Sequence, residues 1–177
     1  AIDPATGEQT VLASGAPFVG LTGLTFDRGR RVIYVSDRGN GAGAPGTIFR
    51  VDPETGKVDP ISAGGELVEP ADLLLEVPPQ FLVSQQSLLV ATGLPGRLVR
   101  VNLVTGQQTV VASAPSAAGL LPAGTGAYYV TSTSGVAIQR YDLADPTNPI
   151  VVGAAGNLQA PTGIAGPIGG LHYVAEN

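Results

Sequence analysis

Ile2-Asp3-Pro4-Ala5-Thr6-Gly7 recurs as Val51-Asp52-Pro53-Glu54-Thr55-Gly56 and again as Val101-Asn102-Leu103-Val104-Thr105-Gly106. A shortened copy, Tyr141-Asp142-Leu143, follows. In the three longer copies an Asp or Asn side chain can bond the backbone two residues further on, and Gly supplies a positive φ before the chain turns back. The recurring segment is therefore predicted to be a β-hairpin turn.

The sequence around each turn repeats as well. The run before the turn alternates in the period-two manner of a strand and carries Arg50, Arg100 or Arg140 at one matching position, where pairing with a carboxylate is expected. Another apolar run follows the turn, a β-branched and aromatic run precedes the arginine strand, and a piece rich in small residues comes first. The arginine run lies at 47–51, 97–101 and 137–141, and the run after the turn at 9–14, 58–62, 108–113 and 150–153. The β-branched and aromatic run lies at 31–36, 88–92, 127–131 and 171–174, and the piece rich in small residues at 21–26, 70–75 and 161–165.

Four strands per repeat of about 40 to 50 residues match the blade of a β-propeller. Small residues in the first strand suit a crowded position at the central channel. The third repeat shows no clean first strand over 117–126. Pro78 and Pro79 interrupt the second repeat, because tandem prolines cannot lie in a central ladder. Solenoid and sandwich alternatives stay open, although neither explains the ordered recurrence as simply.

The two chain ends carry complementary half-repeats, since the chain opens on a third and fourth strand and stops after a first and second. Pairing them would close a ring without exposed edges. The predicted fold is an all-β propeller of four visible four-stranded blades in one domain, 1–177, or an excerpt of a six- to seven-bladed propeller. The blades are expected at about 21–62, 70–113, 117–153, and 161–177 together with 1–14.

Composition supports this class and excludes others. Hydrophobic residues make up 44% of the 177, and 25 Gly and 15 Pro are spread throughout, which favours short strands joined by turns. A net charge of −5 offers no basic surface for nucleic acid, and no apolar run is long enough to span a membrane. There is no Cys for disulfides, and no Met; an extracellular or periplasmic protein whose leader was removed is expected.

The spans 23–27 to 33–37 and 161–165 to 173–177 resemble the repeat of NHL and SMP-30/gluconolactonase-like propellers. That resemblance implies six blades, whereas four are counted here. Enzymes of that group typically hold calcium or another divalent ion in the channel with a Glu, Asn and Asp set. The set does not align residue by residue with this chain, so no activity is carried over.

Ligands of propellers usually bind the face shared by the loops that follow the second and fourth strands of each blade. Oxygen-bearing side chains there suit Ca²⁺, and Glu69 and Asp72 are the metal candidates. The commoner role of Asp and Asn at such places is to end strands and cap turns. Glu66 is a further carboxylate placed in these loops. The candidate ligand-binding residues are Asp37, Arg38, Asn40, Glu69, Asp72, Asn157, Glu176 and Asn177.

His172 is the only histidine, and it lies in a predicted strand without a serine-centred motif, so a packed or surface role is expected rather than catalysis. The leading hypothesis is a non-catalytic propeller module that binds a protein, a glycan or copies of itself. From residue 101 onward only four residues are ionised, which favours association. The alternative is a divalent-metal-dependent hydrolase or lactonase of the SMP-30 type.

Overall fold

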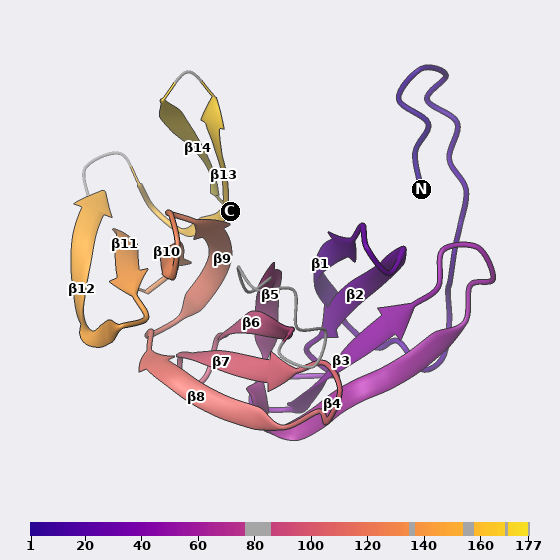
Figure 1. The fold of residues 1–177 in the computed structure, drawn as a ribbon, viewed down its shortest axis with the longest axis horizontal. Helices are drawn as coiled ribbons and strands as arrows, with labels where there is room; N and C mark the ends of the chain where they lie inside the picture. The colour runs from indigo at the N-terminus through magenta and orange to yellow at the C-terminus, as the bar shows by residue number, and fades with distance from the viewer. Residues whose placement is uncertain (77–85, 135–136, 154–157, 169, 177) are drawn as a thin grey trace.

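A computed structural model describes residues 1–76, 86–134, 137–153, 158–168 and 170–176. These residues form fourteen β-strands, arranged as three four-stranded antiparallel sheets and one two-stranded sheet (Figure 1). They contain no helix long and apolar enough to cross a membrane. The chain is thus all-β, as the sequence predicts.

Each complete sheet is an up-and-down blade in which chain neighbours are also sheet neighbours. This is the predicted order of four strands per repeat. The first blade comprises β1 (Leu21–Asp27), β2 (Val32–Asp37), β3 (Pro45–Val51) and β4 (Val58–Val68), and the second β5 (Pro70–Glu76), β6 (Ser87–Thr92), β7 (Arg97–Asn102) and β8 (Gln108–Ser113). The third comprises β9 (Ala117–Pro122), β10 (Ala127–Ser132), β11 (Ala137–Asp142) and β12 (Asp145–Gly153), and the fourth only β13 (Pro161–Ile168) and β14 (Leu171–Glu176).

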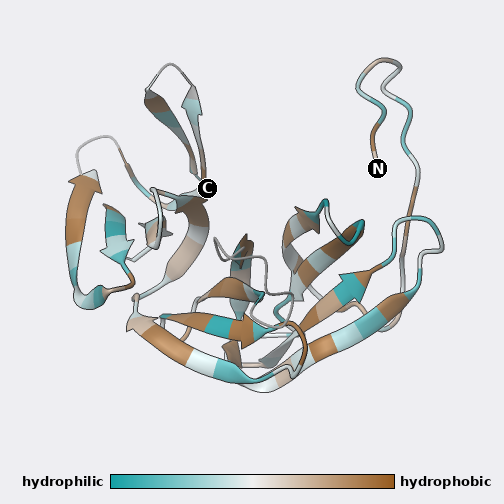
Figure 2. Ribbon diagram, in the orientation of Figure 1, coloured by the Kyte–Doolittle hydropathy of each residue, from teal (hydrophilic) through white to brown (hydrophobic). Residues whose placement is uncertain are grey.

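The blades stack face to face along an arc, with β1, β5, β9 and β13 innermost (Figure 1). Alternate residues of β6 explain the stacking, because successive strand side chains point to opposite faces. Leu88 is buried in one cluster with Tyr34 of the first blade, whereas Leu89 is buried in another with Val130 of the third. Hydrophobic residues accordingly line strands of every blade in Figure 2.

Small residues in the innermost strands permit close packing between blades. A Cβ added at Gly23 would lie 2.8 Å from the Cα of Asp72, and one added at Gly119 would lie 2.8 Å from the carbonyl oxygen of Thr162. Both distances are too short for a real Cβ atom. The predicted crowding of the first strand of each blade is confirmed at these two joints.

Two elements differ from the sequence-based expectation. Ala117–Pro122 forms the strand β9, because backbone pairing and packing order a stretch whose small side chains carry no strand pattern. The outer strand β4 runs on to Val68, so Glu66 lies in a strand rather than a loop, and there it forms an ion pair with Arg97. The Pro78–Pro79 break lies outside the described residues.

The chain ends do not build the predicted composite blade. Among the described residues, the first ten pair only with one another, through an isolated bridge between Ile2 and Gln9 and neighbouring backbone bonds. The N-terminus and the β13–β14 sheet lie on opposite sides of the arc's opening (Figure 1). The ring is therefore not closed within the chain, and the arc is consistent with an excerpt of a larger propeller.

Candidate ligand-binding face

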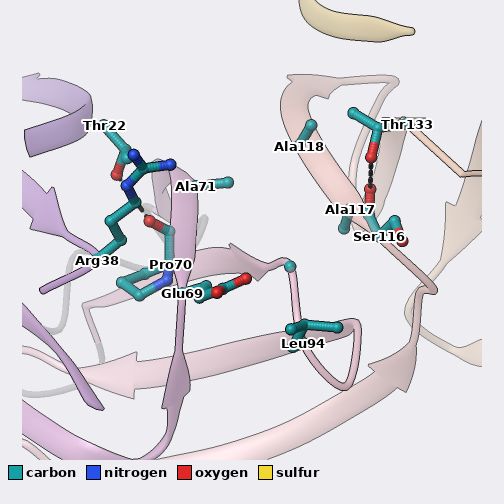
Figure 3. Close-up of a pocket in the computed structure, with 11 residues that line it drawn as sticks. Thr22, Arg38, Glu69, Pro70, Ala71, Leu94, Ser116, Ala117, Ala118 and Thr133 are labelled. Carbon is teal, nitrogen blue, oxygen red and sulfur yellow. Dashed lines mark hydrogen bonds between the residues drawn. The ribbon is translucent and has the colours of Figure 1, made fainter. Parts of the chain in front are cut away.

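The corners that lead into the innermost strands surround a pocket of about 360 Å³ on one face of the arc (Figure 3). Three successive blades contribute to it. Its lining comprises Thr22, Arg38, Glu69, Pro70, Ala71, Gly93, Leu94, Ser116, Ala117, Ala118 and Thr133. This is the face on which the sequence predicts ligand binding.

One backbone hydrogen bond recurs at the pocket in all three blades. The carbonyl oxygens of Gly20, Glu69 and Ser116 accept hydrogen bonds from the N–H groups of Arg38, Gly93 and Thr133, at 2.9, 3.0 and 3.1 Å. Glu69 and Ser116 hold left-handed φ values of 50° and 52°, which side-chain-bearing residues rarely adopt. Such strain concentrates at functional positions, and here it shapes the pocket rim.

Arg38 and Glu69 give the pocket its charge. Arg38 is exposed and forms no ion pair with any other described residue. In Figure 3 its side chain extends towards Thr22, while the Glu69 carboxylate points towards Leu94. One Glu69 oxygen, Oε1, accepts a hydrogen bond from the Gly43 N–H at 2.8 Å. The guanidinium group is therefore free to bind a ligand oxygen.

Asp37 and Glu176 occupy the same repeat position and act as turn caps. Asp37 is buried, and its carboxylate accepts hydrogen bonds from the N–H groups of Val19, Gly20 and Gly39 at 2.7, 3.0 and 2.8 Å. Glu176 accepts one from the Gln159 N–H at 2.9 Å. These contacts match the capping alternative that the sequence left open, because the oxygens already bind backbone donors.

The remaining predicted ligand residues are dispersed. Asn40 is exposed in the loop after β2 and does not line the pocket. Asn157 and Asn177 lie outside the described residues.

Asp72 is half-buried between innermost strands and does not line the pocket. Its Oδ1 accepts a hydrogen bond from the Leu73 N–H and its Oδ2 one from the Leu120 N–H, both at 2.9 Å. Burial raises its pKa, although these two bonds oppose the shift. The described residues contain no group of three His, Asp or Glu side chains that could hold a metal ion. Calcium binding by Glu69 and Asp72 stays a prediction.

The recurring arginines form structural pairs, as expected, in two blades. Arg50 donates to Asp59 at 2.7 Å, and Arg100 binds both oxygens of Glu76, at 2.7 and 3.0 Å. Glu76 is the last residue of β5, whereas Pro70 at the other end of that strand lines the pocket. The pairs therefore stabilise blades away from the pocket. No ion pair of Arg140 occurs in the described part of the chain.

His172 packs between blades rather than in the pocket. Its ring meets that of Tyr129 edge to face, with centroids 4.7 Å apart. This contact joins β14 to β10, while His172 as a whole is exposed, which fits the expected packed or surface role. Sequence reasoning missed Ser116 and Thr133 as lining residues, although they occupy the repeat positions of Gly20 and Arg38 and could have been found by aligning the corners.

The chain is similar to known proteins in its structure and not in its sequence. No protein family model and no curated protein matches its sequence. Its structure is similar to a chain of a nidogen/laminin complex (TM-score 0.63, 21% identity, 81% of this chain and 51% of that one). It is also similar to virginiamycin B lyase from Staphylococcus aureus (TM-score 0.65, 14% identity, 90% of this chain and 50% of that one). A third similar structure is hydrazine synthase of Kuenenia stuttgartiensis (TM-score 0.57, 16% identity, 85% of this chain and 40% of that one).

The first two of these neighbours are β-propeller proteins, and at such low identities the likeness establishes the fold only. This chain spans about half the length of each of them. A propeller fold is thereby confirmed, whereas membership of the NHL or SMP-30 group is not.

Proposed function

We propose that this chain is a non-catalytic β-propeller module that binds a protein partner through the pocket face. The observation that carries the proposal is the pocket itself, which three blades build from equivalent corners and in which Arg38 has no ionic partner among the described residues. A rim built by rotational repetition offers contacts on several sides of a ligand. A single exposed arginine then gives that ligand an orientation.

The chemistry of the lining favours a protein segment with an acidic side chain. Pro70, Leu94 and three alanines provide apolar contact area, and Arg38 provides a fork of donors that fits a carboxylate. Apolar surface around an arginine is typical of protein–protein interfaces. A structural neighbour comes from a nidogen/laminin complex, which supports protein binding by this fold. A glycan partner is the alternative outcome, and an exported location is part of the proposal.

Hydrolysis is supported less well by the side chains on this face. The pocket residues include one carboxylate, Glu69, and no histidine, and Asp72 is half-buried and does not line the pocket. A general base next to a nucleophile is therefore not assembled from the described residues of the pocket. Its Ser and Thr residues instead hold backbone corners, as the contact between Thr133 and the Ser116 carbonyl illustrates (Figure 3).

A displayed library of random twelve-residue peptides, selected on the purified chain, tests the proposal. We expect enrichment of peptides carrying Asp or Glu, and we expect Arg38→Ala to weaken their binding about tenfold or more, because a hydrogen bond to a charged group contributes roughly 1.5–3 kcal/mol. Arg31→Ala is the matched control, since Arg31 is an exposed arginine away from the pocket. Equal binding by wild type and Arg38→Ala would contradict the proposal.

A further inference from the structure

The pocket holds one positive and one negative side chain that do not neutralise each other. Arg38 and Glu69 both line it, yet among the described residues no ion pair joins them. In Figure 3 the guanidinium group lies beside Thr22, whereas the Glu69 carboxylate is directed towards Leu94. Each charge is therefore available to a ligand group of the opposite sign.

The Glu69 carboxylate is held in its own place by backbone contacts. Its Oε1 accepts a hydrogen bond from the Gly43 N–H at 2.8 Å, and its main-chain carbonyl accepts one from the Gly93 N–H at 3.0 Å. Gly43 belongs to the same loop between β2 and β3 that carries Arg38. This loop therefore positions both charges, the cation directly and the carboxylate through the Gly43 N–H.

The second carboxylate oxygen of Glu69, Oε2, is open to the pocket. It accepts no hydrogen bond from any described residue. A Cβ added at Gly93 would lie 3.2 Å from it, so the missing side chain leaves space beside this oxygen. Gly93 does not have a left-handed φ, and Arg38 and Thr133 donate the equivalent backbone bond in the other blades. The backbone does not require glycine at residue 93, and what glycine provides there is room.

Glycine makes room for Arg38 in the same way. A Cβ added at Gly20 would lie 3.2 Å from the Arg38 Cγ and 2.7 Å from the Gly39 carbonyl oxygen. The aliphatic part of Arg38 thus passes over Gly20, while its backbone N–H is fixed to the Gly20 carbonyl oxygen at 2.9 Å. The guanidinium group consequently extends from an anchored base.

The surroundings of Glu69 favour a long basic side chain over a small cation. Leu94 lies in the direction of the carboxylate and is 47% exposed, and Ala117 also lines the pocket. Lys and Arg side chains lay their aliphatic part along apolar surface and keep the charged group at a polar site. The space beside Glu69 offers both kinds of contact.

We propose that the pocket binds a protein segment that carries an acidic and a basic side chain together, the acid on Arg38 and the base on the Glu69 carboxylate. This inference rests on the proposed function and makes Glu69 a residue that determines specificity. Because both anchors are fixed, the acid and the base of the partner must stand at one spacing. A segment of uniform charge would satisfy one anchor and oppose the other.

The peptides selected on the purified chain give the first test. We expect a Lys or Arg to accompany the Asp or Glu at a constant spacing. Calorimetry then compares one such peptide with a copy whose basic residue is replaced by alanine. Glu69→Gln should weaken binding of the peptide about fivefold and leave binding of the alanine copy unchanged, because only the first contact is lost. Gln retains an acceptor for the Gly43 N–H.

Glu54→Gln is the matched control, since Glu54 is an exposed carboxylate that pairs with Arg31 and does not line the pocket. It should bind both peptides as the wild type does. Circular dichroism verifies that both variants keep their β-structure.

The outcomes separate this inference from the proposed function. Selected peptides without a basic residue, or an equal effect of Glu69→Gln on both peptides, would overturn the inference. Tighter binding by Glu69→Gln would overturn it too, because it would mean that Glu69 pairs with Arg38 in the empty pocket. In each of these cases Arg38→Ala should still weaken binding of both peptides. If Arg38→Ala binds both as the wild type does, the proposed function itself fails.

Discussion

At the scale of single residues, Glu76 is a well-connected polar group in the described part of the chain. Its carboxylate accepts hydrogen bonds from Ser87 and Tyr128 in addition to those from Arg100, and so joins the second blade to the third. Burial alone would raise the pKa of Glu76, but the bonds and charge of Arg100 outweigh it and lower that pKa. The same buried environment raises the pKa of Tyr128.

Replacing Glu76 by Gln should lower the free energy of unfolding at pH 7 by about 1–3 kcal/mol, since Arg100 and Tyr128 lose a charged acceptor. A pKa lowered by folding means that this stabilisation is present above the unfolded value near 4.5 and is lost as the pH falls through the lower folded value. Urea unfolding of both proteins at pH 7, 5 and 3 checks this. A difference that stays constant across the three pH values would refute the assignment.

The sequence anticipates residue roles where the cause is local. Asx capping follows from a side chain and an N–H group two residues away, and the strand arginines indicate pairing in general terms. The particular partners are a different matter, because Glu76 is 24 residues from Arg100 and 52 from Tyr128. Arg38 and Glu69 could be placed on the binding face, but the bond of Asp72 to the Leu120 N–H, 48 residues away, could not be foreseen.

At the scale of elements, the innermost strands test the packing account. Gly119→Ala should destabilise the fold by about 1–3 kcal/mol, because its Cβ would meet the Thr162 carbonyl at 2.8 Å and the Gly163 Cα at 3.1 Å. Gly163→Ala is the control: its Cβ would lie 3.6 Å from Ala175, an ordinary contact. Thermal unfolding of the two variants compares them directly. Equal losses would mean that close approach of β9 and β13 does not limit the residue at 119.

Strands with alternating large side chains could be predicted, and those ordered by their surroundings could not. The runs that became β2, β6 and β10 carry their own apolar pattern. By contrast, β9 is built from Ala, Gly and Leu and depends on partners such as Asp72 and Thr131, which accept bonds from its Leu120 and Gly119 N–H groups. The extension of β4 to Val68 likewise depends on contacts with the next blade.

At the scale of the whole molecule, the repeat predicted the order of strands in the three complete blades correctly, but the predicted composite blade of the two chain ends does not form. Whether two half-blades meet depends on the curvature set by the joints between blades, which the pattern within one repeat does not contain. In the structure these joints leave an open arc, with apolar residues such as Leu24 and Tyr173 exposed at its two ends.

Titration of the unmodified chain with an acidic peptide selected for binding tests this account most directly. Binding should weaken about tenfold or more in Arg38→Ala and stay unchanged in Arg31→Ala, because Arg38 lines the pocket and Arg31 does not. Circular dichroism verifies that both variants keep their β-structure. Equal affinity of the two variants for the peptide would contradict binding through the pocket face.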